Sequence, residues 1–290
     1  PRLRPEIDSL PAYRAGQMPA PRTDIETYKI SSNETPFEPP EAVRRAIEQA
    51  AATVHRYPDP FSRRLTGALA RRFDVREEQI ALGTGSVAVV GLLIWAAAGP
   101  GDSVVYPWRS FEAYPIWVQM TGARSVQVPL LADERHDLPS MLKAIDDSTR
   151  IVFVCNPNNP TGEAVRRDEL TEFIDAVPSD VIVVLDEAYR EFISDTDVPD
   201  GLDFFHERNN VVVIRTFSKA YGLAGLRVGF AIAPEPIAEG MRKTALPFGV
   251  SSIAEDAALA ALECEDELFE RVRHLSQERD RVWQALADQG

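Results

Sequence analysis

The sequence predicts an α/β protein built on a doubly wound, mostly parallel sheet. Two observations carry this prediction: short apolar runs rich in Val and Ile recur along the chain, and amphipathic stretches separate them. Continuous apolar runs are typical of strands buried on both faces, and their alternation with helices is typical of a parallel sheet. With 290 residues, the chain is long enough for one large domain or two smaller ones.

The elements follow in order. Residues 1–37 contain six prolines in the first 36 positions and no periodic pattern, so we expect an extended arm there. A proline pair then opens a helix, and the prolines at 58 and 60 separate it from a second helix. The expected strands are 79–82, 103–106, 125–128, 151–154, 181–185, 211–214 and 228–233. The expected helices are 40–51, 61–73, an apolar helix from 86 that ends at 99–100, 111–120, 138–145, 167–176, 234–244, 252–262 and 266–288.

Composition excludes several classes of protein. The net charge of −14 argues against nucleic acid and anionic membranes as partners. The longest apolar run, 87–98, is too short to span a bilayer, and the start of the chain lacks the apolar core of a signal peptide. Cys155 and Cys264 are far apart, and the four histidines lack metal-ligand spacing, so we expect neither a disulfide framework nor a zinc site. A cytoplasmic protein is the expectation.

The stretch VVVIRTFSKAYGLAGLRVG, residues 211–229, carries the strongest chemical signal. Lys219 follows a buried strand, at the edge of the sheet where α/β proteins bind ligands. A lysine there can form a Schiff base if its surroundings favour the neutral amine. Arg227 follows eight residues later, and its planar fork suits a phosphate. Taken alone, a lysine after a strand is in most cases an ordinary solvated surface residue, so the rest of the chain has to supply the evidence for a chemical role.

Two further motifs lie where neighbouring apolar runs end. In VIVVLDEAY, residues 181–189, Asp186 ends a strand of apolar residues, where a carboxylate is costly unless it faces a cation or donors. In CNPNNPTG, residues 155–162, two Asn-Pro pairs fix the backbone and direct Asn159 over the same edge. The alternatives are a carboxylate that caps a turn and a purely structural loop.

The segment 83–86, Gly-Thr-Gly-Ser, lies between a strand and a helix and predicts an anion site at the helix N-terminus. Residues 83–88 also satisfy G-x-G-x-x-A, and Asp102 lies about 20 residues downstream, as a dinucleotide-binding fingerprint requires. An NAD-dependent dehydrogenase is therefore the rival prediction from a different class. It leaves Lys219, Asp186 and the NPNNPTG loop without a role.

Pyridoxal 5′-phosphate accounts for all of these residues together. It needs a phosphate site, an acid at the ring nitrogen, hydrogen-bond partners at the ring oxygen and a lysine at the aldehyde. The strand ends offer Ser86, Ser218 and Arg227 for the phosphate, Asp186 for the nitrogen, Asn159 and Tyr189 for the oxygen, and Lys219 for the aldehyde.

SKAYGLAGLRVG, DEAY and NPNNPTG together resemble the class I/II, fold-type I aminotransferases, and within them the histidinol-phosphate aminotransferase family. The resemblance implies a pyridoxal-phosphate enzyme with a large cofactor domain, a small domain built from both termini, and a homodimer with shared active sites. It divides this chain into an arm (1–37), the large domain (38–265) and a helix (266–290) leading to a C-terminal small domain that the chain lacks.

The resemblance also implies a role for each matching residue. Lys219 would be the covalent attachment point and general base, Asp186 would pair with the ring nitrogen, and Tyr189 and Asn159 would hold the ring oxygen. Trp108 would stack on the cofactor, and Tyr57 would reach the partner subunit's phosphate site. The phosphate set is Gly85, Ser86, Val87, Ser218 and Arg227, and the substrate pocket would include Tyr13, Asn33 and Tyr57, with Phe37, Trp108 and Phe248 as further flat or apolar candidates.

Departures from the family pattern bear on the substrate. The arm carries Thr35 where histidinol-phosphate enzymes usually carry Asn, and Val87 and Ala88 replace their usual polar residues. With WRSFEAYP, these features look more like the aromatic amino acid (phenylalanine) aminotransferase branch. We therefore expect aromatic amino acids with 2-oxoglutarate as acceptor, and histidinol phosphate as the alternative. The family's carboxylate-binding arginine lies in the absent C-terminal segment, so no residue is named for it.

Overall fold

The computed structural model describes residues 4–8, 10, 20 and 22–289. Its centre is a seven-stranded sheet in the order β1-β7-β6-β5-β4-β2-β3. The strand β7 runs antiparallel to both of its neighbours, and the remaining pairs are parallel, which confirms the predicted sheet. The strands are β1 (Ile80–Gly83), β2 (Ser103–Trp108), β3 (Arg124–Pro129), β4 (Thr149–Cys155), β5 (Ile182–Asp186), β6 (Val211–Thr216) and β7 (Gly229–Ile232).

The helices begin and end within about two residues of the predicted bounds. They are α2 (Glu41–Ala51), α3 (Arg63–Phe73), α4 (Ser86–Ala97), α5 (Ala113–Thr121), α6 (Leu138–Lys143), α7 (Arg167–Ala176), α9 (Glu235–Thr244), α10 (Ser252–Glu263) and α11 (Glu265–Ala287). Two short helices were not predicted, α1 (Pro5–Asp8) and α8 (Gly201–Glu207). Both are too short for a helical period to be visible in the sequence.

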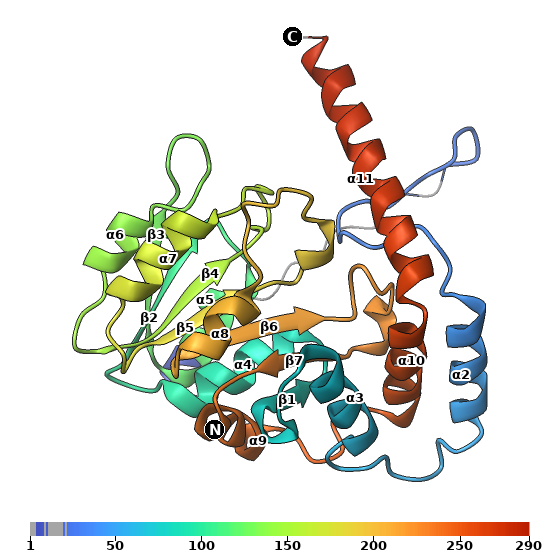
Figure 1. Ribbon diagram of the computed structural model, residues 1–290, viewed down its shortest axis with the longest axis horizontal. Helices are drawn as coiled ribbons and strands as arrows, with labels where there is room; N and C mark the ends of the chain where they lie inside the picture. Colours follow the sequence, from blue (N-terminus) through green and yellow to red (C-terminus); the bar gives the residue numbers. More distant parts are fainter. Residues whose placement is uncertain (1–3, 9, 11–19, 21, 290) are drawn as a thin grey trace.

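Helices cover both faces of the sheet (Figure 1). The strand side chains alternate between two hydrophobic cores. On β5, Val183 and Leu185 pack into the core formed with α3, α6, α7, α8 and α10, while Val184 packs into the core formed with α4, α5 and α9. Because successive residues of a strand point to opposite faces, Asp186 is directed toward α5 and Glu187 toward α8. This alternation decides which helix supplies the partners of each carboxylate.

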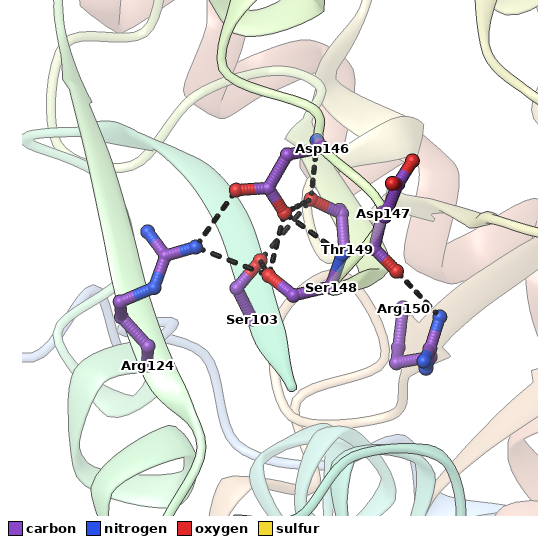
Figure 2. A network of polar contacts seen from close by, with 7 residues as sticks. All are labelled: Ser103, Arg124, Asp146, Asp147, Ser148, Thr149 and Arg150. Atoms are coloured by element: carbon purple, nitrogen blue, oxygen red, sulfur yellow. Dashed lines mark hydrogen bonds and ion pairs between the residues drawn. The ribbon is translucent and has the colours of Figure 1, made fainter. Parts of the chain in front are cut away.

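A network of polar side chains connects strands at their amino-terminal ends, the edge of the sheet opposite their carboxyl ends (Figure 2). The carboxylate of Asp146 accepts hydrogen bonds from the hydroxyls of Ser148 and Thr149 and from the guanidinium of Arg124. Ser103 Oγ lies 3.1 Å from Thr149 Oγ1. The network therefore joins the first residues of β2, β3 and β4, and it leaves the carboxyl ends of the strands for other contacts.

The last helix, α11, packs through Leu268 and Val272 and then extends away from the rest of the molecule (Figure 1). Most of its residues beyond Val272 are exposed. Among the described residues, none of the helices is both long enough and apolar enough to cross a membrane. The predicted division of the chain at residues 37 and 265 stays a prediction.

Candidate active site

A cleft with a volume of about 560 Å³ opens at the carboxyl ends of the central strands. Side chains reach it from the ends of β4, β5 and β6, from the first turn of α4 and from the segment 31–34. The structure brings together nine of the residues named from the sequence: Asn33, Ser86, Val87, Asn159, Asp186, Tyr189, Ser218, Lys219 and Arg227.

The amino end of α4 and the guanidinium of Arg227 meet at one corner of the cleft, which we call the anion corner. This arrangement depends on two glycines. Gly85 precedes α4 with φ of 83°, and a Cβ there would lie 2.2 Å from Arg227 Nη2. Gly229 on β7 faces the helix start, where a Cβ would lie 2.5 Å from the Ser86 backbone nitrogen. Without side chains at either position, the amino end of α4 packs closely against β7 beside the guanidinium. Free N–H groups and the helix dipole at such an end favour an anion.

Arg227 completes this corner. Its Nη1 donates to Ser218 Oγ at 3.2 Å and to the carbonyl of Ala224 at 2.9 Å. The residue has a positive φ of 56°, so the turn after Lys219 folds back and returns the guanidinium to the start of α4. No carboxylate within the described residues pairs with it, so its charge is available to a ligand.

Asp186 ends β5 and is 3% exposed. Its Oδ2 accepts a hydrogen bond of 2.6 Å from Tyr114 Oη, and its Oδ1 is buried without a partner among the described residues. Burial raises the pKa of this carboxyl group, and the hydrogen bonds from Tyr114 and from the Ala188 backbone oppose that shift. Because a buried acceptor without a partner is costly, Oδ1 marks the place where a ligand with a positive N–H would be held.

Lys219 lies at the cleft with its amine half-buried. Its Nζ donates to the carbonyl of Ser32 at 3.0 Å and to that of Asn33 at 3.3 Å. Burial lowers its pKa, Glu34 opposes this shift, and the positive charge of Arg227 adds to it. A lowered pKa increases the fraction of neutral amine, which is the nucleophilic form.

Three more predicted residues, Asn33, Tyr189 and Asn159, line the cleft together with the lysine. Asn33 Nδ2 donates to Tyr189 Oη at 3.0 Å, and Lys219 Nζ lies 5.6 Å from the centre of the Tyr189 ring. Asn159 lines the cleft from the loop after β4, where the bonds preceding Pro157 and Pro160 are both cis. The segment 31–34, the NPNNPTG loop and the DEAY motif thus meet at one place.

Four aromatic residues named from the sequence, Phe37, Tyr57, Trp108 and Phe248, do not line this cleft. Trp108, predicted to stack on the cofactor, ends β2 and packs edge-on against Tyr106, outside the cleft. Tyr57 is 84% exposed and stacks on Phe248 with ring centres 4.7 Å apart. Tyr13 lies outside the described residues.

The structure also shows residues that the sequence did not single out. Phe111, just before α5, lines the cleft where Trp108 was expected. Tyr114, one turn later, is completely buried and holds Asp186. The i, i+3 spacing of the two aromatic residues was the available signal for Phe111. Nothing local could indicate Tyr114, because its partner is 72 residues away.

A larger hollow of about 1160 Å³ adjoins the cleft and shares Asn33, Asn159 and Tyr189 with it. Its arginines face carboxylates: Arg135 pairs with Asp133 and Glu169, and Arg166 pairs with Asp195. The hollow contains neither a lysine nor an unpartnered buried acid among the described residues. The smaller cleft is therefore the candidate active site.

Comparisons with known proteins agree on one family. Residues 26–290 match the family described as aminotransferase class I and II. The chain is 59% identical over 290 residues to the aromatic amino acid aminotransferase of Streptomyces coelicolor, covering 100% of this chain and 80% of that protein. It is 54% identical over 290 residues to the enzyme of the same name from Thermobifida fusca, with the same coverage.

Solved structures agree on the fold. Histidinol-phosphate aminotransferase from Sinorhizobium meliloti, in complex with pyridoxal-5′-phosphate, superposes with a TM-score of 0.83 at 34% identity, covering 89% of this chain and 70% of that one. N-succinyldiaminopimelate aminotransferase from Mycobacterium tuberculosis has a TM-score of 0.78 at 25% identity, covering 88% and 71%.

Proposed function

The chain belongs to the class I and II aminotransferases, and from that premise we propose that it transfers the amino group of aromatic amino acids to 2-oxoglutarate with pyridoxal 5′-phosphate as cofactor. Relatives between 45% and 59% identical carry the name aromatic amino acid aminotransferase. The solved histidinol-phosphate aminotransferase at 34% identity is a complex with pyridoxal-5′-phosphate.

The observation that carries the proposal is the unpartnered Oδ1 of Asp186, in the same cleft as Lys219 and Arg227. A protonated pyridine nitrogen would give this buried oxygen a charged donor. The start of α4, Ser218 and Arg227 offer donors to a phosphate, and the absence of a side chain at Gly85 leaves room for Arg227 to approach. The residues present therefore fit the cofactor.

Each residue then has a specific task. Arg227, Ser218 and the first turn of α4 hold the phosphate, and Asp186 holds the ring nitrogen. Tyr189 and Asn159 would hold the ring oxygen, and Phe111, which lines the same cleft, would contact the ring. When bound, the cofactor supplies an electron sink for the carbanion that forms at the substrate α-carbon. Lys219 would attach the cofactor, and after the amino group of a substrate has displaced it, its freed, half-buried amine would take the α-proton.

The charges beside the cleft favour an aromatic over a phosphorylated substrate. A second phosphate would need its own unpaired cations. Within the described residues, the arginines of the adjoining hollow are engaged: Arg135 and Arg166 as above, Arg167 with Asp203, and Arg279 with Asp280. Histidinol phosphate stays the alternative, because the structural neighbour at 34% identity carries that name.

Exposed apolar residues around Tyr57 support a homodimer. Tyr57 and Phe248 stack on each other at the surface, and Val54, Phe61 and Leu246 from the same two segments are also exposed. Exposed apolar clusters of this kind mark interaction sites. In a dimer with shared sites, Tyr57 would serve the partner's cleft, which accounts for its position outside its own.

A substrate panel tests the proposal. The protein loaded with pyridoxal phosphate is assayed with 2-oxoglutarate and phenylalanine, tyrosine, tryptophan or histidinol phosphate. We expect kcat/KM for an aromatic amino acid to exceed that for histidinol phosphate by at least about tenfold. Lys219→Ala should abolish turnover, and Lys243→Ala, at an exposed lysine on α9, should not. The reverse preference would assign the enzyme to histidinol phosphate, and failure to bind the cofactor would overturn the proposal.

A further inference from the structure

Tyr114 is a completely buried tyrosine whose hydroxyl faces the acid of the cleft. It lies in the first turn of α5, and its Oη donates to Asp186 Oδ2 at 2.6 Å. The bond is short, as expected when the acceptor is charged. It occupies one carboxylate oxygen and leaves Oδ1, which has no partner in the part of the chain that the structure describes, as the oxygen available to a ligand.

Aromatic neighbours fix the Tyr114 ring from several sides. Phe153 on β4 stacks on it with ring centres 4.5 Å apart and an interplanar angle of 23°. Tyr106 and Phe111 meet it edge to face, each at 5.7 Å. These contacts hold the hydroxyl in place without the help of Asp186. Phenylalanine at this position would keep all of them and lose only the hydrogen bond.

The electrostatics make Tyr114 a donor to a carboxylate. Burial, followed by the negative charge of Asp186, raises the pKa of the Tyr114 phenol well above its usual value, so the hydroxyl keeps its proton. Two further titratable groups that interact with Asp186 are also neutral: burial raises the pKa of Cys155 to about 12 and raises that of Tyr189. Tyr114 is thus the side chain that stabilises the charged form of Asp186 before a ligand arrives.

We propose that Tyr114 is a positioning residue that keeps Asp186 ionised, with Oδ1 free for the ring nitrogen of the cofactor. This inference rests on the proposed function, because it concerns the same cleft. It assigns a role to a residue that does not touch the cofactor and whose place in the sequence does not indicate one. The hydrogen bond would strengthen cofactor binding by sparing the cost of ionising a buried acid at the moment of binding.

The test compares Tyr114→Phe with Tyr106→Phe. Tyr106 is also completely buried, but its hydroxyl accepts from Gln127 Nε2 at 3.1 Å, on the far side from Asp186. The dissociation constant of pyridoxal phosphate is measured by titrating the apoproteins. A hydrogen bond to a charged group predicts a loss of about tenfold or more for Tyr114→Phe, and a change within about twofold for Tyr106→Phe.

A second readout separates electrostatics from packing. With cofactor labelled with ¹⁵N in the ring, the nitrogen should give a pyridinium signal in the wild type and in Tyr106→Phe. It should move toward the neutral pyridine position in Tyr114→Phe, because Asp186 becomes more basic and draws the proton. Wild-type affinity together with an unchanged ¹⁵N signal in Tyr114→Phe would overturn the inference. If the wild-type protein bound no cofactor, the proposed function would fall, and the inference with it.

The wild-type protein gives an independent measurement should Tyr114→Phe not fold. The hydroxyl proton of Tyr114, buried and bonded at 2.6 Å, should give a downfield proton resonance that exchanges slowly with water. It should vanish in Asp186→Asn, where the charged acceptor is gone. A resonance that survives this substitution, or none in the wild type, would overturn the inference.

Discussion

The guanidinium of Arg215 lies 2.7 Å from the carboxylate of Glu187, the residue next to Asp186, and both side chains are buried. Arg215 Nη2 also reaches Asp200 Oδ1 at 2.6 Å, and Glu187 Oε1 accepts from the Gly201 backbone at 2.7 Å. Asp186 and Glu187 therefore have different roles on opposite faces of the sheet at the end of β5. One faces the cleft, and the other ties β5 to β6 and to α8.

Arg215→Met tests the structural half of this division. It leaves the Glu187 charge buried and unpaired, and breaking such a pair costs about 3–5 kcal/mol of unfolding free energy. The double variant Arg215→Met with Glu187→Leu should recover most of the loss, because neither charge remains. Urea unfolding measures both, with Lys243→Met in the exposed Lys243–Glu239 pair as a control that changes little. A loss below about 1 kcal/mol for the single variant would show that the buried pair is not stabilising.

Gly85→Ala tests the anion corner. The residue has a positive φ, and the new Cβ would meet the Arg227 guanidinium. Either the guanidinium or the start of α4 has to move, so we expect cofactor affinity to fall by about tenfold or more, the equivalent of about 1.4 kcal/mol. Gly99→Ala is the matched control, because a Cβ there meets nothing within 4 Å. Equal affinities for the two variants would show that the phosphate does not bind at this corner.

His136 predicts how the stability of the fold depends on pH. The side chain is 7% exposed, and burial lowers its pKa from 6.5 to about 4. The unfolded chain binds this proton near pH 6.5 and the folded chain does so only near 4, so the unfolding free energy falls as the pH drops through this window. The contribution of this group approaches about 3 kcal/mol at pH 4.

His136→Phe should remove that part of the acid sensitivity, because phenylalanine binds no proton. Unfolding free energies measured at several pH values between 7 and 4 provide the comparison, with His55→Gln at an exposed position as the control. An acid profile in His136→Phe that follows the wild type would exclude a buried neutral histidine as the cause.

The sequence could predict those parts of the site that lie in short motifs of consecutive residues. Lys219, Asp186 and Asn159 each follow an apolar run, and parallel strands bring their carboxyl ends to one edge, so their meeting follows from the pattern alone. The strands were visible for the same reason, since a buried strand is a short apolar run between polar segments.

The remaining parts depend on packing between distant segments. Trp108 is the last residue of β2 and Phe111 follows three residues later, and only the point where β2 ends and α5 begins decides which of them reaches the cleft. The Tyr114–Asp186 bond joins a helix to a strand three strands away in the chain order. The short helix α8 forms where Asp200 caps Leu202 and where Glu187 accepts from Gly201, and no periodic pattern accompanies it.

The measurement that tests the central claim most directly is the location of the covalent attachment. The protein loaded with pyridoxal phosphate is reduced with borohydride and digested, and the labelled peptide is identified by mass spectrometry. The chain has four lysines, Lys29, Lys143, Lys219 and Lys243, and only Lys219 lines the cleft with Asp186 and Arg227. We predict a single label on Lys219. A label on another lysine, or no label under conditions where the enzyme turns over, would contradict the account.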